Sequence, residues 1–459
     1  MTHEFTEDFL NSIIKAYDIR GLVGDQVTAE FARAVGSAFA RFLIEESEPQ
    51  HIVIGEDMRP SSSQLADAFA EGAMAHGVSV TRIGLASTDM LYFASGKLNL
   101  PGVMFTASHN PAAYNGMKLC KSGARPIGKE SGLLRIKELI NVAPEAAPAS
   151  FGKQDRTELL TSYVDFLFSL FPGVSPTSGR KLKVVIDAGN GMGGYTAPAV
   201  MAKLNVDLTP MYFELDGNFP NHEANPIEAK NLVDLQAKVR EVGADIGLAF
   251  DGDADRCFLV DEKGQLVNPS SLTALIAVRE LDRKPGSTII YNLISSRAVP
   301  EIVAESGGTS LRSRVGHSYI KAMMAESGAI FGGEHSGHFY FADFWKADSG
   351  MLAALYALTE LAARSAPLSE VLAPFNRYFA SGEINTEVSD VPAAITRVLA
   401  QFTATHSLDE LDGITLTGAT HWFNVRPSNT EPLLRLNVEA SSQAEMEQVR
   451  DQVLALIKG

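Results

Sequence analysis

Residues 183–194 read KVVIDAGNGMGG, in which a short apolar run rich in β-branched side chains leads directly into a glycine-rich loop. An alanine-rich helical segment follows the loop. The same order recurs at residues 51–60 (HIVIGEDMRP), 246–251 (IGLAFD) and 288–292 (TIIYN). This alternation is typical of α/β units whose sheets are covered on both faces. Ligands bind to such sheets outside the carboxyl ends of the strands, where the loops collect.

The length of the chain predicts several domains. With 459 residues, 45% of them apolar, the chain is far too long for one hydrophobic core. Proline, glycine and loop signals place the boundaries in the Pro/Ala segment 142–150, near 261–264 and around 373–382. The predicted domains are 1–150, 151–261, 262–375 and 376–459. The first three read as α/β. The last alternates strand-like runs and ends in a helix from about residue 444 to 457, so it reads as α+β.

Charge and cysteine content exclude several classes of protein. There are 55 Asp and Glu residues against 39 Lys and Arg residues, which gives a net charge of −16 and makes nucleic acid an unsuitable partner. Cys120 and Cys257 are too few for a disulfide framework and fit a reducing compartment. The first twenty residues do not resemble a signal peptide, and the apolar stretch 350–363 is too short to span a bilayer. We therefore expect a cytoplasmic protein with no membrane partner.

The serine at position 108 is a candidate nucleophile. Residues 103–111 read VMFTASHNP, so Ser108 lies just after a predicted strand and has His109 beside it. A hydroxyl next to an imidazole can accept a phosphoryl group and pass it on. Serine in a loop more often only bonds the backbone, so the neighbouring groups decide between these two interpretations.

Lys118 follows the Ser108 loop at a short distance in the sequence. The pair Asn115 and Gly116 predicts a hairpin turn that would bring Lys118 back towards Ser108. An ammonium group there could bind phosphate oxygens or transfer a proton. The alternative is a surface lysine on an edge strand, and spacing alone does not separate the two.

A triplet of carboxylates predicts a metal site. Asp251, Asp253 and Asp255 stand at alternate positions, so in an extended segment they point the same way and can bind one hard cation. With Glu262 they also match four ligand positions of an EF-hand loop. That loop needs glycine at its sixth position, which is Arg256 here, and the apolar flanks read as strands. Magnesium in a phosphate-handling site is preferred, with a solvated acidic turn as the remaining alternative.

Two further loops carry polar groups that a simple connection does not need. Residues 332–338 read GGEHSGH and offer a carboxylate and a hydroxyl to sugar hydroxyls. Residues 426–432 read RPSNTEP and join two strand-like runs. The second loop combines a guanidinium group, hydroxyls and an amide, which together can hold a phosphate group. Taken singly, each loop could be an ordinary polar turn.

The order of these motifs resembles that of the α-D-phosphohexomutases, in the bacterial phosphomannomutase/phosphoglucomutase branch. The motif AYDIRG at 16–21 comes first, followed by the loops that contain Ser108, Asp251, Glu334 and Arg426. The resemblance covers essentially the whole chain. It implies four domains around a central cleft: three related α/β domains with mixed sheets, and a C-terminal α+β domain like that of TATA-binding protein.

The resemblance also implies an activity. Such an enzyme interconverts hexose 6-phosphate and hexose 1-phosphate, here of mannose with glucose as a further candidate. The route is a phosphoserine and a hexose 1,6-bisphosphate, which also serves as activator. The expected partner is a small phosphosugar, and the protein is expected to be a monomer or a homodimer.

Residue roles follow from the same resemblance. Mg²⁺ would be held by phosphorylated Ser108 with Asp251, Asp253 and Asp255. The groups implied at the reacting phosphate are Ser108, His109, Lys118, Arg20, Arg256 and His338, of which Lys118 and His338 are the candidates for proton transfer. The groups implied at the sugar and the non-reacting phosphate are Tyr17, His317, Glu334, Ser336, Arg426, Ser428, Asn429 and Thr430.

Some alternatives stay open at this stage. Position 335 is His, where dual-specificity bacterial members of the family have Met, so the sugar preference is undecided. Within the family, a phosphoglucosamine mutase is the second candidate. A non-catalytic phosphosugar-binding protein is a third, although it would not need three aspartates. A phosphatase would result if a phosphoserine were exposed to water.

Overall fold

The computed structural model describes residues 5–142, 150–171, 179–427 and 433–459. It divides into two compact units, of which the first comprises Met1–Pro269 with Ser336–Val371 and the second Ser270–His335 with Leu372–Gly459. In the described parts of the chain, every helix is too short or too polar to cross a membrane.

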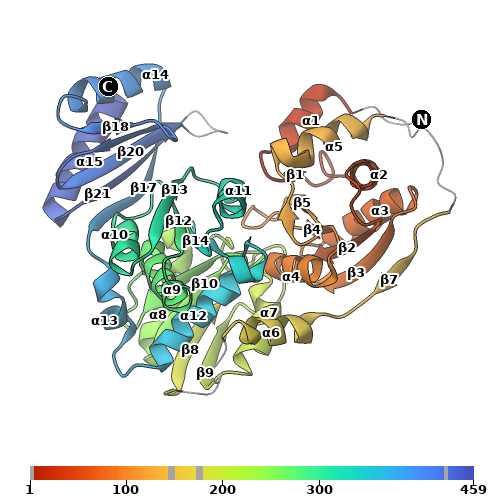
Figure 1. The fold of residues 1–459 in the computed structure, drawn as a ribbon, viewed down its shortest axis with the longest axis horizontal. Helices are drawn as coiled ribbons and strands as arrows, with labels where there is room; N and C mark the ends of the chain where they lie inside the picture. Colours follow the sequence, from red (N-terminus) through yellow and green to blue (C-terminus); the bar gives the residue numbers. More distant parts are fainter. Residues whose placement is uncertain (1–4, 143–149, 172–178, 428–432) are drawn as a thin grey trace. The chain divides into compact units, whose positions relative to one another are not determined.

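The first unit begins with a mixed sheet of strand order β1-β5-β4-β2-β3-β7, and β6 pairs with β5 (Figure 1). Strands β4, β2, β3 and β7 run parallel, whereas β5 is antiparallel to both β4 and β1. The bounds are β1 (Ile19–Leu22), β2 (His51–Glu56), β3 (Ser79–Leu85), β4 (Gly102–Phe105), β5 (Tyr114–Lys121), β6 (Arg125–Pro126) and β7 (Gln154–Arg156).

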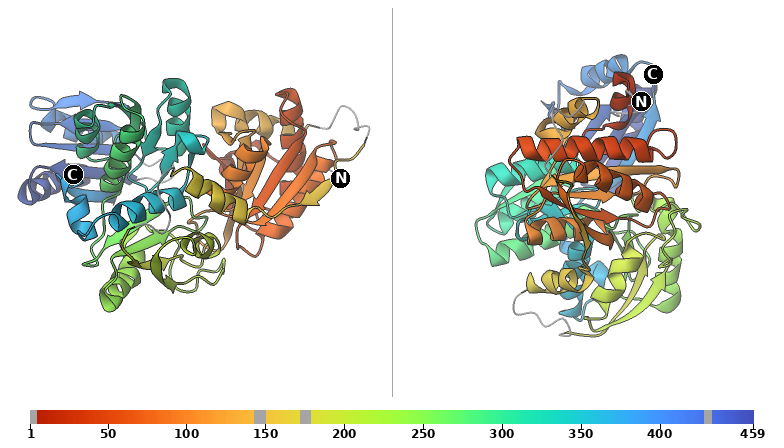
Figure 2. Two further views of the ribbon diagram at one scale, coloured as in Figure 1. Left: turned by 60° about the horizontal axis from the view of Figure 1, so that its bottom comes forward. Right: turned by 90° about the vertical axis from the view of Figure 1, so that its right-hand side faces the viewer.

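Helices cover both faces of this sheet because alternate strand residues point in opposite directions. Ile52 and Ile54 join the core formed with α2 and α3, whereas Val53 faces α4 on the other side. Helices α2 and α3 lie side by side (Figure 2), and a Cβ at Gly36 would stand 2.1 Å from the Phe69 carbonyl oxygen. The helices are α1 (Glu7–Ile13), α2 (Ala29–Glu45), α3 (Ser62–Met74), α4 (Thr88–Leu98), η1 (Lys129–Leu133) and α5 (Leu134–Ile140).

A second sheet in the same unit has the order β11-β10-β8-β9, with only β11 antiparallel to its neighbour. Strands β10 and β11 flank the loop 251–256, so the strands predicted there are confirmed and the EF-hand alternative is excluded. The elements are α6 (Leu160–Ser169), β8 (Leu182–Asp187), α7 (Gly193–Met201), β9 (Val206–Met211), η2 (Ala229–Leu232), α8 (Val233–Val242), β10 (Ile246–Phe250) and β11 (Cys257–Asp261).

The first unit is completed by an antiparallel hairpin and a buried helix from later in the chain. Strands β15 and β16 pair with Tyr340 opposite Asp348, and Ser349 then caps the following helix with its side chain. The elements are β15 (Phe339–Phe341), η3 (Ala342–Phe344), β16 (Ala347–Asp348) and α12 (Gly350–Ala362). Helix α13 (Leu368–Leu372) follows at the limit of this unit.

The second unit contains a parallel group in which β12 pairs with both β13 and β14. Its helices and strands are α9 (Pro269–Arg283), β12 (Thr288–Asn292), α10 (Ala298–Glu305), β13 (Thr309–Ser313), α11 (His317–Ser327), β14 (Phe331–Gly333) and η4 (Ala373–Phe375). The apolar run predicted as a strand at 288–292 is therefore confirmed.

The C-terminal part of this unit is an antiparallel sheet of order β17-β21-β20-β19-β18. Helices α14 and α15 share one hydrophobic core with it, so the predicted α+β fold is confirmed. The final helix runs somewhat longer than the predicted 444–457. The bounds are β17 (Phe379–Glu387), α14 (Val391–Phe402), β18 (Ser407–Asp409), β19 (Ile414–Thr417), β20 (His421–Pro427), β21 (Leu433–Ala440) and α15 (Gln443–Lys458).

Candidate active site

Ser108 lies in the loop that leaves the carboxyl end of β4, where the sheet type predicts ligands to bind. The residue is buried and has a φ of 49°, a left-handed conformation that is uncommon for serine. Its backbone N–H donates to Thr106 Oγ1 at 2.9 Å. Its hydroxyl donates to Asp251 Oδ2 at 2.7 Å and lies 3.1 Å from His109 Nδ1. The loop therefore holds one particular hydroxyl against a carboxylate.

The carboxylates of Asp251, Asp253 and Asp255 converge, as their spacing predicts. One oxygen from each lies within 4.8 Å of the others, and all three residues are buried. Oδ1 of Asp253 and Oδ1 of Asp255 accept no hydrogen bond from the described residues. A Cβ at Gly252 would stand 2.3 Å from the Ser108 carbonyl oxygen, so only glycine lets this loop pack on the serine. The buried oxygen atoms without donors fit a hard cation.

The pKa values of two aspartates in the triplet are shifted in opposite directions. Burial, together with the charges of Asp255 and Asp253, raises the pKa of Asp251 well above its ordinary value. Burial acts in the same direction on Asp255, but the neighbouring Lys118 and His338 outweigh it and hold the pKa of Asp255 well below its ordinary value. Asp251 and Asp255 thus differ in their affinity for a proton.

Lys118 reaches the triplet from β5, which pairs with β4 so that Lys118 lies opposite Met104. Its Nζ lies 2.7 Å from Asp253 Oδ2 and 2.6 Å from Asp255 Oδ2. Burial alone would lower the pKa of this ammonium, but the two carboxylates outweigh it and raise the pKa well above its ordinary value. The surface-lysine alternative is wrong, and the group is a protonated cation in the cluster.

The hairpin turn predicted at Asn115 and Gly116 is wrong. Both residues lie inside β5, where they pair with Gly21 and Arg20 of β1. Gly116 is explained by close strand approach, because a Cβ there would stand 2.2 Å from the Ile19 carbonyl oxygen. An Asn-Gly pair predicts a turn only where it does not lie in a strand that pairs on both sides, as it does here in β5.

Two arginines predicted at the reacting phosphate lie in the same cluster. Arg20 Nη1 donates to Asn110 Oδ1 at 2.5 Å, within the Ser108 loop. The backbone N–H of Arg256 donates to Asp251 Oδ1 at 3.1 Å. Tyr17 is half-buried in the bend that precedes β1. His109 is half-buried, and desolvation with the charges of Arg256 and Arg20 lowers the pKa of its imidazole well below the ordinary value.

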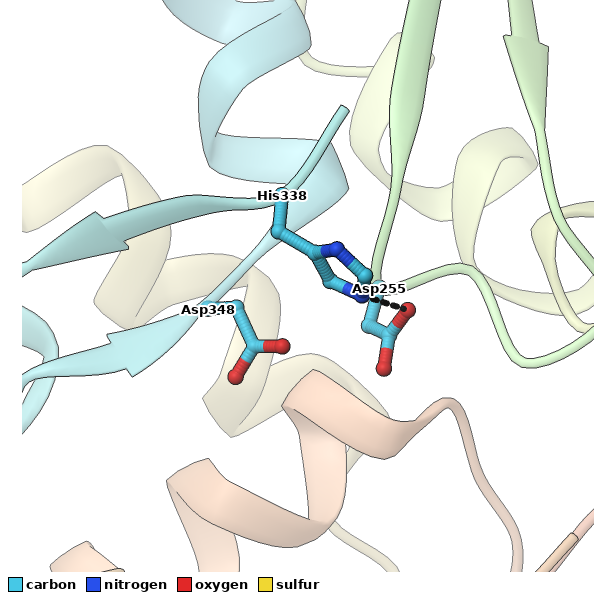
Figure 3. A group of neighbouring side chains, drawn as sticks. All are labelled: Asp255, His338 and Asp348. Carbon is cyan, nitrogen blue, oxygen red and sulfur yellow. Dashed lines mark ion pairs between the residues drawn. The ribbon is translucent and has the colours of Figure 1, made fainter. Parts of the chain in front are cut away.

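His338 brings a second group to the triplet (Figure 3). Its Nε2 lies 3.4 Å from Asp255 Oδ1 and accepts from Arg256 Nε at 3.3 Å. Its Nδ1 lies 2.9 Å from Ser336 Oγ. An arginine has only donors and a carboxylate only acceptors, so Nε2 has one neighbour of each kind. Figure 3 also shows the carboxylate of Asp348 beside the imidazole, a buried neighbour that the sequence did not predict.

Other residues that hold the aspartate loop in place were also not predicted from the sequence. Thr88, at the start of α4, donates from Oγ1 to Asp253 Oδ2 at 2.5 Å and from its backbone N–H to the Asp253 carbonyl at 2.9 Å. The glycine-rich loop at 187–194 packs behind the same loop, because the Met192 N–H donates to the Gly252 carbonyl at 2.9 Å. That glycine pattern therefore serves close backbone packing against the aspartate loop.

In the second unit, Glu334 is buried at the end of β14. Its Oε1 accepts from the Gly316 N–H at 3.1 Å and from Asn292 Nδ2 at 3.3 Å. His335 is half-buried, and its Nδ1 lies 2.8 Å from Asn292 Nδ2. His317 begins α11, but its side chain is outside the described part of the chain.

Arg426 lies in a cluster of its own in the C-terminal sheet. It lies opposite Arg435 on the neighbouring strand, and both guanidinium groups donate to Glu383. Arg426 Nη2 lies 2.8 Å from Oε2 of this carboxylate, and Arg435 Nη1 lies 3.3 Å from Oε1. Burial would raise the pKa of Glu383, but Arg426, His335 and Arg435 outweigh it and lower the pKa. The predicted phosphate-loop residues Ser428, Asn429 and Thr430 lie outside the described residues.

Comparison with known proteins agrees with this geometry. Family models for the four domains of phosphoglucomutase/phosphomannomutase match the chain: α/β/α domain I at residues 11–146, α/β/α domain II at 161–264, α/β/α domain III at 268–378 and the C-terminal domain at 383–456. The chain therefore belongs to the phosphoglucomutase/phosphomannomutase family.

Individual relatives match over nearly their full length. The phosphomannomutase of Escherichia coli is 39% identical over 450 residues, which is 96% of this chain and 97% of the relative. The phosphomannomutase/phosphoglucomutase of Pseudomonas putida is 36% identical over 458 residues, which is 98% of this chain and 96% of the relative. The crystal structure of a family protein from Burkholderia thailandensis matches with a TM-score of 0.87 at 32% identity, over 97% of each chain. The predicted class of enzyme, a hexose phosphate mutase, and its four-domain fold class are confirmed.

Proposed function

We propose that this protein interconverts the 6-phosphate and 1-phosphate of mannose, with glucose as a second substrate, through a phosphoserine at Ser108. The observation that carries the proposal is the Ser108 hydroxyl, held 2.7 Å from Asp251 inside a cluster of three convergent carboxylates. The names of the curated relatives support the choice of sugars. A family relationship alone would not say which hydroxyl reacts, and this arrangement supports the choice of Ser108.

The reaction proceeds in two transfers that conserve the phosphoryl groups. In the first, the bond between phosphorus and Ser108 Oγ breaks and Oγ takes up a proton, while a bond forms from phosphorus to the free hydroxyl of a hexose monophosphate, whose proton passes to His338. The product is a hexose 1,6-bisphosphate. After this intermediate turns round, Ser108 Oγ gives up its proton and bonds to the phosphorus of the other phosphoryl group, while the bond from that phosphorus to the sugar oxygen breaks and the sugar oxygen takes up a proton. Positioning and charge neutralisation supply most of the rate.

Lys118 and His338 are the groups that move protons. Lys118 stays protonated because Asp253 and Asp255 raise its pKa, so it binds the phosphoryl oxygens as a cation. We also assign it the donation of a proton to the leaving oxygen. His338 has an Nε2 that accepts a hydrogen bond from Arg256, so it is the better proton acceptor. Arg20 and Arg256 add positive charge at the reacting phosphate. His109 stays neutral beside the serine, since its pKa is lowered.

Asp251, Asp253 and Asp255, with the phosphate on Ser108, would hold one Mg²⁺ ion. The buried oxygens that lack donors, Oδ1 of Asp253 and Oδ1 of Asp255, support this choice. When bound, the ion supplies positive charge that neutralises the oxygens of the phosphoryl group. We assign the activator role to hexose 1,6-bisphosphate, because it can restore the phosphate on Ser108.

The remaining predicted residues hold the rest of the substrate. Tyr17, His317, Glu334 and Ser336 would contact the sugar, and Ser336 also orients His338 through its bond to Nδ1. Arg426, Ser428, Asn429 and Thr430 would bind the non-reacting phosphate. The proposed domains are 1–150 with the serine loop, 151–261 with the metal loop, 262–375 with the sugar loop and 376–459 with the phosphate loop. We propose a cytoplasmic monomer or homodimer.

A coupled assay tests the proposal. The purified full chain is given the 1-phosphates of mannose, glucose and glucosamine in turn, with Mg²⁺ and a trace of bisphosphate. Formation of the 6-phosphate is measured beside release of inorganic phosphate. We expect the mannose compound to turn over fastest, glucose next and glucosamine slowest, with little phosphate release. Fastest turnover of the glucosamine compound, or phosphate release that exceeds isomer formation, would contradict the proposal.

A further inference from the structure

Arg59 is a buried arginine that bonds the backbone of the serine loop. Its Nη1 donates to the carbonyl oxygens of Pro111 and Tyr114, each at 2.9 Å. Its Nη2 donates to the carbonyl oxygens of Ser108 at 2.9 Å and Asn110 at 2.7 Å. One side chain from the loop after β2 therefore binds four carbonyl groups of the loop that carries the proposed nucleophile.

The chemistry of these four contacts suits arginine alone. A guanidinium group is planar, always charged and rich in donors, so it can bond several carbonyl groups that diverge from one loop. Carbonyl groups buried without a donor are costly, and those of Ser108 and Asn110 lie in a loop outside the sheet, where no strand partner supplies a donor. A lysine at the same position could reach only part of the set.

The guanidinium group is fixed on its other sides. Asp57 Oδ2 lies 3.2 Å from Arg59 Nε, and both side chains are fully buried. The same aspartate accepts from the Arg59 N–H at 3.0 Å and from Ser62 Oγ at 2.6 Å, so its position is fixed as well. The ring of Phe219 lies 5.0 Å from the guanidinium carbon. A guanidinium group fixed in this way cannot move with the serine loop if that loop changes conformation.

The backbone at Ser108 needs such a support. Its φ of 49° is disfavoured for a residue with a side chain, and conformations of this kind persist only where the surroundings enforce them. The peptide that follows Ser108 is held by Arg59 Nη2 at the carbonyl oxygen. On the other side, the Ser108 N–H is held by Thr106. With both peptides fixed, the hydroxyl is directed at Asp251.

We propose that Arg59 is a positioning residue for phosphoryl transfer, which holds Ser108 in the left-handed conformation that aims its hydroxyl at the aspartate loop. This inference rests on the proposed role of Ser108 as the phosphoryl carrier. Among the described residues Arg59 donates no side-chain hydrogen bond to the three aspartates, although its charge interacts with that of Asp253, and its four hydrogen bonds to carbonyl groups act on the serine-loop backbone. The competing view is that Arg59 only stabilises the fold.

The test compares Arg59→Lys and Arg59→Gln with Arg82→Lys in the full chain. Arg82 is a matched control because it is also buried and pairs with Glu56 and Asp67, away from the serine loop. We expect kcat of both Arg59 variants to fall about 10- to 100-fold, because a small misplacement of a reacting atom has effects of this size. KM and the affinity for Mn²⁺ should each stay within about threefold, and the control should keep its kcat within about threefold.

Mass spectrometry of the Ser108 peptide separates the possible failures. If the wild-type serine never carries an exchangeable phosphate, the proposed function fails and this inference fails with it. If the wild-type serine does, but the folded Arg59 variants turn over as fast as Arg82→Lys, the inference alone is overturned. Should neither Arg59 variant fold, Phe219→Leu loosens the guanidinium group while keeping its bonds. It should then lower kcat about threefold at unchanged KM, and an unchanged kcat would overturn the inference.

Discussion

Two clusters of charged side chains, one in each unit, differ in the sign of the charge that remains after their own ion pairs are counted. The reacting cluster in the first unit is built around Asp251, Asp253 and Asp255 with Lys118, and two of its carboxylate oxygens accept no hydrogen bond from the part of the chain that the structure describes. The arginine cluster in the second unit consists of Arg426, Arg435 and Glu383. There the surplus is positive, and among the described residues the Nε atoms of both arginines have no acceptor. Each cluster therefore leaves the charge that its expected ligand complements: a cation in the first, a phosphate group in the second.

The clusters also differ in how they are supported. The aspartate loop is braced by segments distant in sequence, among them Thr88 and the serine loop over Gly252. The arginines stand on adjacent strands in simple cross-strand register. Changes in the reacting cluster should therefore abolish turnover, whereas changes in the arginine cluster should weaken binding and leave the chemical step in place.

The largest effect is expected for Asp253→Asn. Loss of this carboxylate removes one ligand and one charge, so Mn²⁺ affinity should fall at least about 100-fold and turnover on the order of 1000-fold. Isothermal titration with Mn²⁺ and the coupled assay measure the two quantities. Chelation of metal from the wild type should cause a similar loss that added Mg²⁺ reverses. The exposed Asp451→Asn serves as control, and equal effects in both variants would count against the metal site.

Lys118→Met should come next. Because the ammonium group is the proposed proton donor, kcat should fall about 100- to 10,000-fold. The same change frees Asp253 and Asp255 from their internal cation, so the affinity for Mn²⁺ should rise by about threefold or more. A variant with normal kcat, or with weakened metal binding, would show that this lysine supports the fold and does not compete for the carboxylates.

The arginine cluster gives a smaller and different change. Arg426→Lys keeps the charge but loses the planar arrangement of donors, so KM should rise about 10-fold while kcat changes less than about threefold. The half-buried Arg450→Lys, which leaves the cluster intact, is the matched control. A fall in kcat at unchanged KM would mean that this cluster acts on the chemical step, and the contrast between the two regions would be lost.

The smallest effect concerns stability and pH. Burial raises the pKa of Asp89 from 3.8 to about 6, although the hydroxyl groups of Ser349, Ser87 and Tyr163 donate to it and offset part of the shift. Because the folded pKa lies above the unfolded one, the folded state binds more protons. The stability linked to this carboxyl is therefore complete below about pH 4 and is lost as the pH rises through about 6.

Asp89→Asn removes that dependence. Relative to the wild type, the variant should gain up to about 3 kcal/mol in the free energy of unfolding between pH 4 and pH 7. Urea unfolding at several pH values, with the wild type measured in parallel, provides the comparison. A constant difference between the two proteins across this range would show that Asp89 does not titrate as described.

Much of the reacting cluster could be predicted from the sequence because its signals are local. Alternate spacing places Asp251, Asp253 and Asp255 on one side of an extended segment, and a serine directly after an apolar run lies at the end of a strand. Lys118 was placed correctly for a wrong reason. Strand pairing with β4 brings it to the cluster, whereas the predicted turn at Asn115 does not exist.

The supporting residues could not be predicted because their roles depend on contacts between distant segments. Arg59 precedes a proline and reads as an ordinary loop residue, yet it bonds carbonyl groups some fifty residues away. Thr88 reads as the first residue of a capped helix, although its hydroxyl bonds a carboxylate 165 positions later. Asp348 stands in a two-residue strand with no motif around it. No spacing rule within one segment can find such pairs.

The most direct measurement follows a labelled phosphoryl group. Incubation of the full chain with radiolabelled hexose 1,6-bisphosphate should label the Ser108 peptide, and unlabelled mannose 6-phosphate should then remove the label at least as fast as the enzyme turns over. Ser108→Ala should take up no label and lose its activity. Label that stays on the serine during turnover, or a Ser108→Ala variant that remains active, would contradict the role of this hydroxyl as phosphoryl carrier.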